Sequence, residues 1–192
     1  SPASAPTTLP ASMPTTLPTT APANLTLSLS PADKLAEVPH QITLNNQTLS
    51  YLSTTGYLPL KDENGKTKAN LFFVAYTLTP QTPTTATTES LAPNASRPVT
   101  FVFNGGPGSA SAWLHLGAAG PYKIATPADA TLPTPPGKLV VNPQTWLTDT
   151  DLVFIDPVGT GYSRAQSPEQ NKEYYGVSED VAAVAEFIRL YT

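Results

Sequence analysis

The sequence contains no cysteine and only two histidines. Without cysteine the chain cannot form a disulfide, hold a metal through thiolates or use a cysteine nucleophile. His40 and His115 are too far apart in sequence to form a local pair of metal ligands. We therefore expect neither a metal nor another cofactor.

Charge is also sparse. Charged residues make up 12% of the 192-residue chain, the formal net charge is −4, and the lysines and arginines do not cluster. Nucleic acids and anionic membranes attract basic patches, so neither is an expected partner. The sequence also lacks a run of about 18 apolar residues and a charged leader followed by an apolar block, so we expect a mature, soluble protein without a membrane span.

Residues 1–23 have no charge and carry a proline at every fourth position from Pro2 to Pro22. A proline in every turn excludes a helix, and the threonines, alanines and serines between the prolines offer little to bury. This segment predicts an extended or disordered tether, with one folded domain over residues 24–192. A Pro/Thr-rich stalk of this kind favours a secreted or periplasmic protein.

Residues 41–78 predict two β-hairpins. Apolar residues alternate on both sides of Asn45-Asn46 within the range 41–51. Gly56–Leu60 and Ala69–Leu78 then flank a polar run that contains Asn-Gly, the strongest short signal for a hairpin turn.

Two further β-rich runs each stop at a glycine loop. Val99–Phe103 is followed by Asn-Gly-Gly-Pro-Gly and then by an expected helix over Ser111–Leu116. Leu152–Ile155 is apolar throughout, which is typical of a strand buried on both faces of a parallel sheet. It is followed by Asp-Pro-Val-Gly-Thr-Gly at residues 156–161, and we interpret this loop as an architectural turn in which Asp156 bonds local backbone.

The end of the chain predicts an amphipathic helix over Ser178–Tyr191. Ser178 is the expected N-cap, and Glu179 and Asp180 follow in the first turn, where the helix dipole favours negative charge. The expected apolar face consists of Val181, Val184, Ala185 and Ile188. Strands alternating with helices predict an α/β fold in which the next strand would follow this helix.

The loop at residues 104–108 could bind an anion. Consecutive glycines let backbone N–H groups converge with no side chain in the way, which suits a carboxylate or a developing oxyanion. On the glycines alone, a sharp strand-to-helix turn without a ligand is the alternative interpretation. The loop has neither the Gly-Lys-Ser/Thr of a phosphate loop nor the Gly-x-Gly-x-x-Gly of a dinucleotide site.

Two motifs, in the right order, resemble those of the serine carboxypeptidases, the carboxypeptidase Y-like peptidases. Residues 104–111 read Asn-Gly-Gly-Pro-Gly-Ser-Ala-Ser and are followed by Gly120-Pro121, similar to the family's N-G-G-P-G-C-S-S … G-P signature. Residues 156–163, with Asn142-Pro143 and Trp146 before them, resemble its N-P-x-x-W … D-x-P-x-G-x-G-F-S element. The resemblance implies an α/β-hydrolase fold and an enzyme that releases C-terminal residues from peptides or proteins.

The resemblance also implies roles for three residues of the first loop. The side chain of Asn104 and the backbone N–H of Gly105 would hold the free C-terminal carboxylate of a peptide substrate. The backbone N–H of Gly106 would be one donor of the oxyanion hole, as in other α/β-hydrolases. His115 matches no family role, and a packed or surface histidine is the favoured interpretation.

The chain departs from the family pattern in what it lacks. It has no Gly-x-Ser-x-Gly elbow, which in the family follows the helix that corresponds to Ser178–Tyr191. The resemblance therefore implies that residues 24–192 are the N-terminal part of an α/β-hydrolase domain, truncated before the nucleophile, with the missing C-terminal part as a partner. Ser109 stands where the family often has a disulfide cysteine, and Ala118 stands where it commonly has a glutamate near the substrate carboxylate.

Two alternatives remain open at this point. An esterase or acyltransferase on the same scaffold would share the oxyanion loop but would not need to recognise a C-terminal carboxylate. A non-catalytic binding subunit is the other alternative, because the chain contains no triad.

Overall fold

The computed structural model describes residues 35–79, 96–104, 108–127, 129, 131, 133 and 135–192. All of them belong to one compact unit, Pro31–Thr192. The expected tether over residues 1–23 lies outside the described residues, and the predicted domain boundary stays a prediction.

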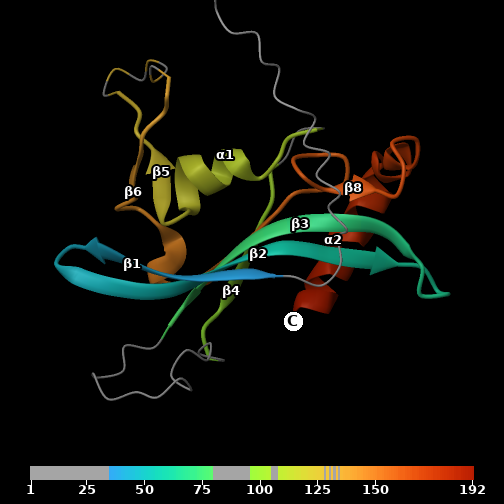
Figure 1. Cartoon of the computed structure of the whole chain (residues 1–192), viewed down its shortest axis with the longest axis horizontal. Coiled ribbons are helices and arrows are strands. Elements are labelled where there is room, and N and C mark those ends of the chain that lie inside the picture. Colours follow the sequence, from blue (N-terminus) through green and yellow to red (C-terminus); the bar gives the residue numbers. More distant parts are fainter. Residues whose placement is uncertain are drawn as a thin grey trace, which may run out of the picture. The chain divides into compact units, whose positions relative to one another are not determined.

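The first three strands form an antiparallel meander (Figure 1): β1 (Ala36–Leu44), β2 (Gln47–Lys61) and β3 (Thr67–Leu78). The turn between β1 and β2 consists of Asn45 and Asn46, with φ angles of 47° and 64°. Asparagine tolerates this left-handed conformation better than most residues, and two such residues in succession give the turn whose twist matches a tight hairpin.

The turn between β2 and β3 is closed by a side chain. Oδ1 of Asp62 accepts hydrogen bonds from the backbone N–H groups of Asn64 and Lys66, both at 2.9 Å, and Gly65 takes a φ of 79°. Both predicted hairpin turns are thus confirmed. The predicted division into four strands is wrong, because β2 runs unbroken through Ser53–Thr55, where it pairs with β1 on one side and β3 on the other.

Two strands from later in the chain extend this sheet, which has the order β1-β2-β3-β7-β4. β7 (Asp151–Ile155) pairs antiparallel with β3 and parallel with β4 (Val99–Val102). All five residues of β7 are buried, as predicted for this apolar run. The expectation of a parallel sheet is only half right, because the sheet is mixed, and its combination with helices is consistent with the predicted α/β class.

The remaining short elements surround this sheet. β8 (Arg164–Ala165) pairs with β3, and β5 (Tyr122–Ile124) pairs with β6 (Leu139–Val141) in a separate two-stranded sheet. The helical elements are α1 (Ala112–Leu114), the π-turn η2 (His115–Ala119), the 3₁₀ turns η3 (Trp146–Thr148) and η4 (Gln170–Tyr174), and α2 (Val177–Tyr191).

Each face of the sheet carries its own apolar cluster. On one face α2 packs through Phe187, which is fully buried against Phe73 of β3 and Tyr191. On the other face Leu147 of η3 and Leu114 of α1 pack on strands β1, β2, β4 and β7. The sheet is therefore covered on both faces.

The bounds and buried face of α2 differ from the prediction. The N-cap is Gly176 rather than Ser178, which lies inside the helix. Of the predicted apolar face, Val184 is buried and Ile188 packs against the core. Val181 is 62% exposed and Ala185 is also exposed, whereas Ala183 and Phe187, which were not predicted, are buried. Phe187 is the largest apolar side chain of the helix, and its burial rotates the helix away from the face that the smaller aliphatic residues suggested.

Candidate functional site

Two loops meet at one edge of the sheet. Because β4 and β7 are neighbouring parallel strands, their carboxyl ends lie together, and the loop after each strand starts there. Asn104 lies close behind β4, and Asp156 follows β7 directly. The carboxyl ends of parallel strands are where open α/β sheets bind their ligands.

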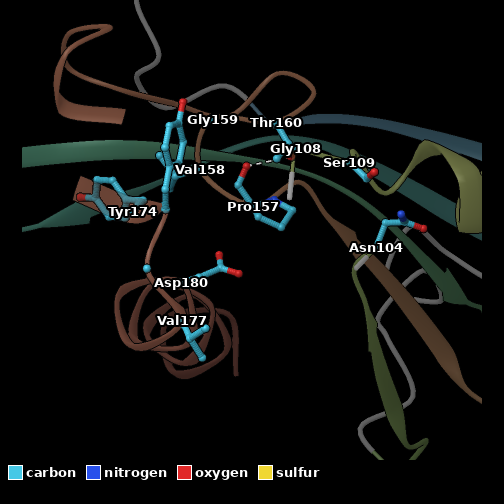
Figure 2. Close-up of a pocket in the computed structure, with 12 residues that line it drawn as sticks. Asn104, Gly108, Ser109, Pro157, Val158, Gly159, Thr160, Tyr174, Val177 and Asp180 are labelled. Carbon is cyan, nitrogen blue, oxygen red and sulfur yellow. Dashed lines mark hydrogen bonds between the residues drawn. The ribbon is translucent and has the colours of Figure 1, made fainter. Parts of the chain in front are cut away.

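A cavity of about 530 Å³ opens beside these loops (Figure 2). Its lining comes from the loop after β4, the loop after β7, the end of η4 and the start of α2: Asn104, Gly108, Ser109, Pro157, Val158, Gly159, Thr160, Tyr174, Tyr175, Gly176, Val177 and Asp180. Figure 2 shows Asn104 on one side of the cavity and the first turn of α2 on another. The volume is in the range of small-molecule and peptide side-chain sites.

Close packing shapes one wall of the cavity. Gly159 has a φ of +86°, and a Cβ at this position would come within 2.8 Å of Cε1 of Tyr175. The hydroxyl of Thr160 donates a 2.9 Å hydrogen bond to the carbonyl oxygen of Pro157. A glycine at 159 thus allows the Tyr175 ring to close against the loop after β7.

The acidic group of the cavity is Asp180. Its carboxylate is directed into the cavity from α2, and partial burial raises its pKa above the ordinary value. Among the described residues no group of three histidine, aspartate or glutamate side chains could hold a metal ion. No helix within the described ranges is long and apolar enough to span a membrane.

The predicted substrate-binding residue Asn104 lines the cavity and is half-buried. Gly105 and Gly106, for which backbone roles were expected, lie outside the described residues. Gly108, at the end of the glycine run, has a φ of +88° and open space where a Cβ would stand. A glycine is favoured there for its backbone conformation rather than by crowding.

Asp156 connects the two loops. Its Oδ1 atom accepts hydrogen bonds from the backbone N–H of Ser111 at 2.8 Å and from the Ser111 hydroxyl at 2.9 Å. Its Oδ2 atom accepts a 3.1 Å hydrogen bond from the backbone N–H of Tyr162. The expected bonding to local backbone is confirmed for Tyr162, but sequence reasoning missed Ser111, which caps α1 and lies 45 residues away.

Ser163 closes the loop after β7. Its hydroxyl donates a 2.6 Å hydrogen bond to the carbonyl oxygen of Asp156 and accepts a 2.8 Å bond from the backbone N–H of Phe72 in β3. Ser163 is fully buried. The loop is therefore fixed to β3 as well as to the loop after β4.

His115 lies under this region as a packed histidine, in agreement with the interpretation from the sequence. Its Nε2 atom is 2.6 Å from the hydroxyl of Tyr76, and its ring stacks on Phe154 with the ring centroids 4.5 Å apart. Burial lowers the pKa of His115 to about 4, although the negative charge of Asp156 acts in the opposite direction. The ring is thus neutral near pH 7 and participates in packing.

Comparison with known proteins adds independent information. A family model described as serine carboxypeptidase matches residues 43–191. The pheromone-processing carboxypeptidase KEX1 of Saccharomyces cerevisiae is 36% identical over 80 residues, which cover 41% of this chain and 10% of that protein. The KEX1 of Debaryomyces hansenii is 30% identical over 141 residues, covering 73% of this chain and 17% of that protein.

A plant protein gives a similar match. Serine carboxypeptidase-like 37 of Arabidopsis thaliana is 27% identical over 146 residues, covering 73% of this chain and 24% of that protein. The chain therefore spans less than a quarter of the length of these curated relatives.

Proposed function

The chain belongs to the serine carboxypeptidase family, and on that premise we propose that it supplies the carboxylate-binding and oxyanion loop of a serine-type carboxypeptidase. The observation that supports this most directly is Asn104, which lines a cavity of about 530 Å³ at the carboxyl ends of β4 and β7. The substrate would be the free C-terminus of a peptide or protein.

Three residues have proposed roles. The amide of Asn104 and the backbone N–H of Gly105 donate hydrogen bonds to the terminal carboxylate of the substrate, which fixes the last peptide bond beside the loop. The backbone N–H of Gly106 donates to the oxyanion that forms when the carbonyl carbon is attacked. Because two of the three groups are backbone N–H donors, glycines suit these positions.

The sequence contains no Gly-x-Ser-x-Gly elbow, so we assign the covalent chemistry to groups outside these 192 residues. We propose that a serine nucleophile, a histidine base and an aspartate that orients it come from the rest of the protein, as in other α/β-hydrolases. The strand-loop-helix order of β4 and α1, repeated in β7 and α2, supports an incomplete α/β-hydrolase fold. The reaction by this triad uses no cofactor.

The charge-free Pro/Thr segment at residues 1–23 supports a secreted or periplasmic location for the enzyme. Cell fractionation of the producing organism tests this directly. Recovery of the protein in the cytoplasmic fraction would contradict the proposed location without affecting the proposed chemistry.

The experiment that tests the function is Asn104→Ala in the complete protein. It removes a donor to the terminal carboxylate, and a hydrogen bond to a charged group is worth about 1.5–3 kcal/mol. We expect kcat/KM for peptides with a free C-terminus to fall about ten- to a hundredfold, with ester- or amide-blocked analogues nearly unaffected. Asn104→Asp should be more severe on the free peptides, because it sets a negative charge against the substrate carboxylate.

Gly106→Val is the contrasting variant. The oxyanion forms with either substrate type, so loss of this donor should depress kcat on both by about a hundred- to a thousandfold. Equal loss on free and blocked substrates in Asn104→Ala would contradict carboxylate recognition and favour an esterase or acyltransferase. A wild-type protein that binds C-terminal peptides without hydrolysing any substrate would favour a binding subunit.

A further inference from the structure

We propose that Asp156 is a positioning residue of the candidate site, because it attaches Ser111, at the start of α1, to the loop after β7. The inference rests on the proposed function for its catalytic consequence. The connection between the loops rests on the geometry alone.

The loop at residues 104–111 is attached at both of its ends. At one end, Val102 of β4 pairs with Phe154 of β7 two positions before Asn104. At the other end, Ser111 is bonded twice to Asp156, two positions after Phe154. Both attachments are therefore made to the same strand, β7, and its direct continuation.

The donors around position 156 require a carboxylate there. Three donors converge on it: the Ser111 N–H, the Ser111 hydroxyl and the Tyr162 N–H. A side chain that only accepts hydrogen bonds, on two separate oxygens, satisfies all three, whereas an amide of equal size has one accepting oxygen. Asp156 is 4% exposed, so a donor left without its acceptor could not turn to water instead.

The negative charge of Asp156 does not explain its position between these loops. Among the described residues Asp156 has no ion-pair partner, because the two ion pairs join Arg97 to Asp151 and Arg189 to Glu186. A negative charge opposes a developing oxyanion rather than stabilising it. The carboxylate is therefore not suited to stabilise the transition state, and its contribution is geometric.

The loop after β7 leaves space for the carboxylate of Asp156. Gly161 has a φ of +44°, and a Cβ at this position would overlap Oδ2 of Asp156. The glycine lets the backbone pass over the carboxylate closely enough for the Tyr162 N–H to reach it. Ser111 and the loop after β7 thus both contact the carboxylate of Asp156.

The test uses Asp156→Asn, which keeps the volume but lets one of the two oxygens become a donor. Asp151→Asn is the matched control, because Asp151 is a buried aspartate at the opposite end of β7, bonded to Arg97 and to the N–H of Leu78. In the complete protein we expect kcat to fall about ten- to a hundredfold in Asp156→Asn, on free and blocked substrates alike, since a misplacement of about 1 Å can cost that much. The ratio of KM values for free and blocked substrates should stay unchanged, because β4 still holds Asn104.

Ser111→Ala separates positioning from general destabilisation. It removes the hydroxyl bond and leaves the backbone bond, so we expect a fall in kcat of only a few fold. Combined with Asp156→Asn it should add almost nothing, because both changes break the same attachment. The Asp151→Asn control should lower stability and leave kcat within about twofold of wild type.

A second readout does not depend on activity. Amide hydrogen exchange at Ser111 and Tyr162 should accelerate at least tenfold in Asp156→Asn relative to amides elsewhere in the sheet, whereas in Asp151→Asn these two amides should change no more than the rest of the sheet. Unchanged exchange in Asp156→Asn, or fully additive effects of the two substitutions on kcat, would overturn the positioning role. If Asp156→Asn does not fold, unchanged exchange and unchanged kcat in Ser111→Ala overturn it equally. An inactive wild-type protein with accelerated exchange in Asp156→Asn would refute the proposed function and uphold the attachment of the loops.

Discussion

Acidification should destabilise the protein through His115 between about pH 6.5 and pH 4. Burial lowers the pKa of this histidine from its ordinary value of 6.5 to about 4. Across that interval the unfolded state binds a proton that the folded state excludes, so the free energy of unfolding falls as the pH falls. Above pH 6.5 the histidine is neutral in both states, and its contribution to the pH dependence disappears.

The groups around His115 set the size of the effect. Burial also raises the pKa of Tyr76 to about 12, so its hydroxyl stays neutral and can donate to Nε2 of the neutral ring. Asp156 favours the protonated ring, but the cost of burying a charge beside Phe154 is larger. Each unit of pKa corresponds to about 1.4 kcal/mol, so the whole shift amounts to about 3 kcal/mol of stability at neutral pH. This is a large part of the 5–15 kcal/mol typical of folded domains.

Urea denaturation between pH 4 and pH 7.5 measures this contribution. The free energy of unfolding should depend less steeply on pH in His115→Gln than in the wild-type protein, because glutamine can bond Tyr76 but does not titrate. The carboxylates contribute equally to the pH dependence of both proteins. His40→Gln, at an exposed site, is the matched control for the substitution itself and should leave the stability at pH 7.5 nearly unchanged. If His115→Gln keeps the wild-type slope between pH 4 and pH 6.5, the buried neutral histidine is refuted.

Two further pairs of substitutions test the packing by thermal or urea unfolding. Phe187→Ala should lower the free energy of unfolding by about 3–5 kcal/mol, because the Phe187 ring is fully buried. Val181→Ala, at a site that is 62% exposed, should cost less than about 0.5 kcal/mol. Similar losses in the two variants would contradict the assigned face of α2. Gly161→Ala should be clearly more harmful than Gly65→Ala, because both glycines have positive φ but only the first would meet the Asp156 carboxylate. For Gly65→Ala we expect only the conformational cost, about 1 kcal/mol, and equal melting temperatures of the two variants would count against the crowded loop.

Local chemistry made the hairpin turns and one central strand predictable. Asn45-Asn46 and Asn64-Gly65 carry their conformations in their own side chains, or in the lack of one, so a short stretch of sequence suffices to identify them. Leu152–Ile155 is apolar at every position, a pattern typical of a strand covered on both faces.

Features that depend on residues distant in the sequence could not be predicted from the sequence. The continuity of β2 through Ser53–Thr55 results from pairing on both sides, which a scan for alternating residues cannot detect. The orientation of α2 depends on the aromatic rings that receive Phe187 from β3 and β4. Helical spacing alone gave a neighbouring stripe.

The same distinction holds at the candidate site. Asn104 could be nominated from the sequence because it belongs to a contiguous motif; it lines the cavity, and its role in binding stays a proposal. The contact between Ser111 and Asp156 joins two motifs 45 residues apart. Each motif could be recognised by itself, but only the parallel pairing of β4 and β7 brings their loops together.

The pairing of β3 with β7 also bears on the rate of folding. Strands β1, β2 and β3 are consecutive and joined by tight turns, so their pairing closes only short loops at little entropic cost. β7 reaches β3 from beyond β4, α1, β5 and β6, and long-range pairings of this kind slow folding. The meander can therefore assemble as a local unit, whereas the edge that carries both glycine loops is completed only when β7 docks and brings the two halves of the chain into one cooperative structure.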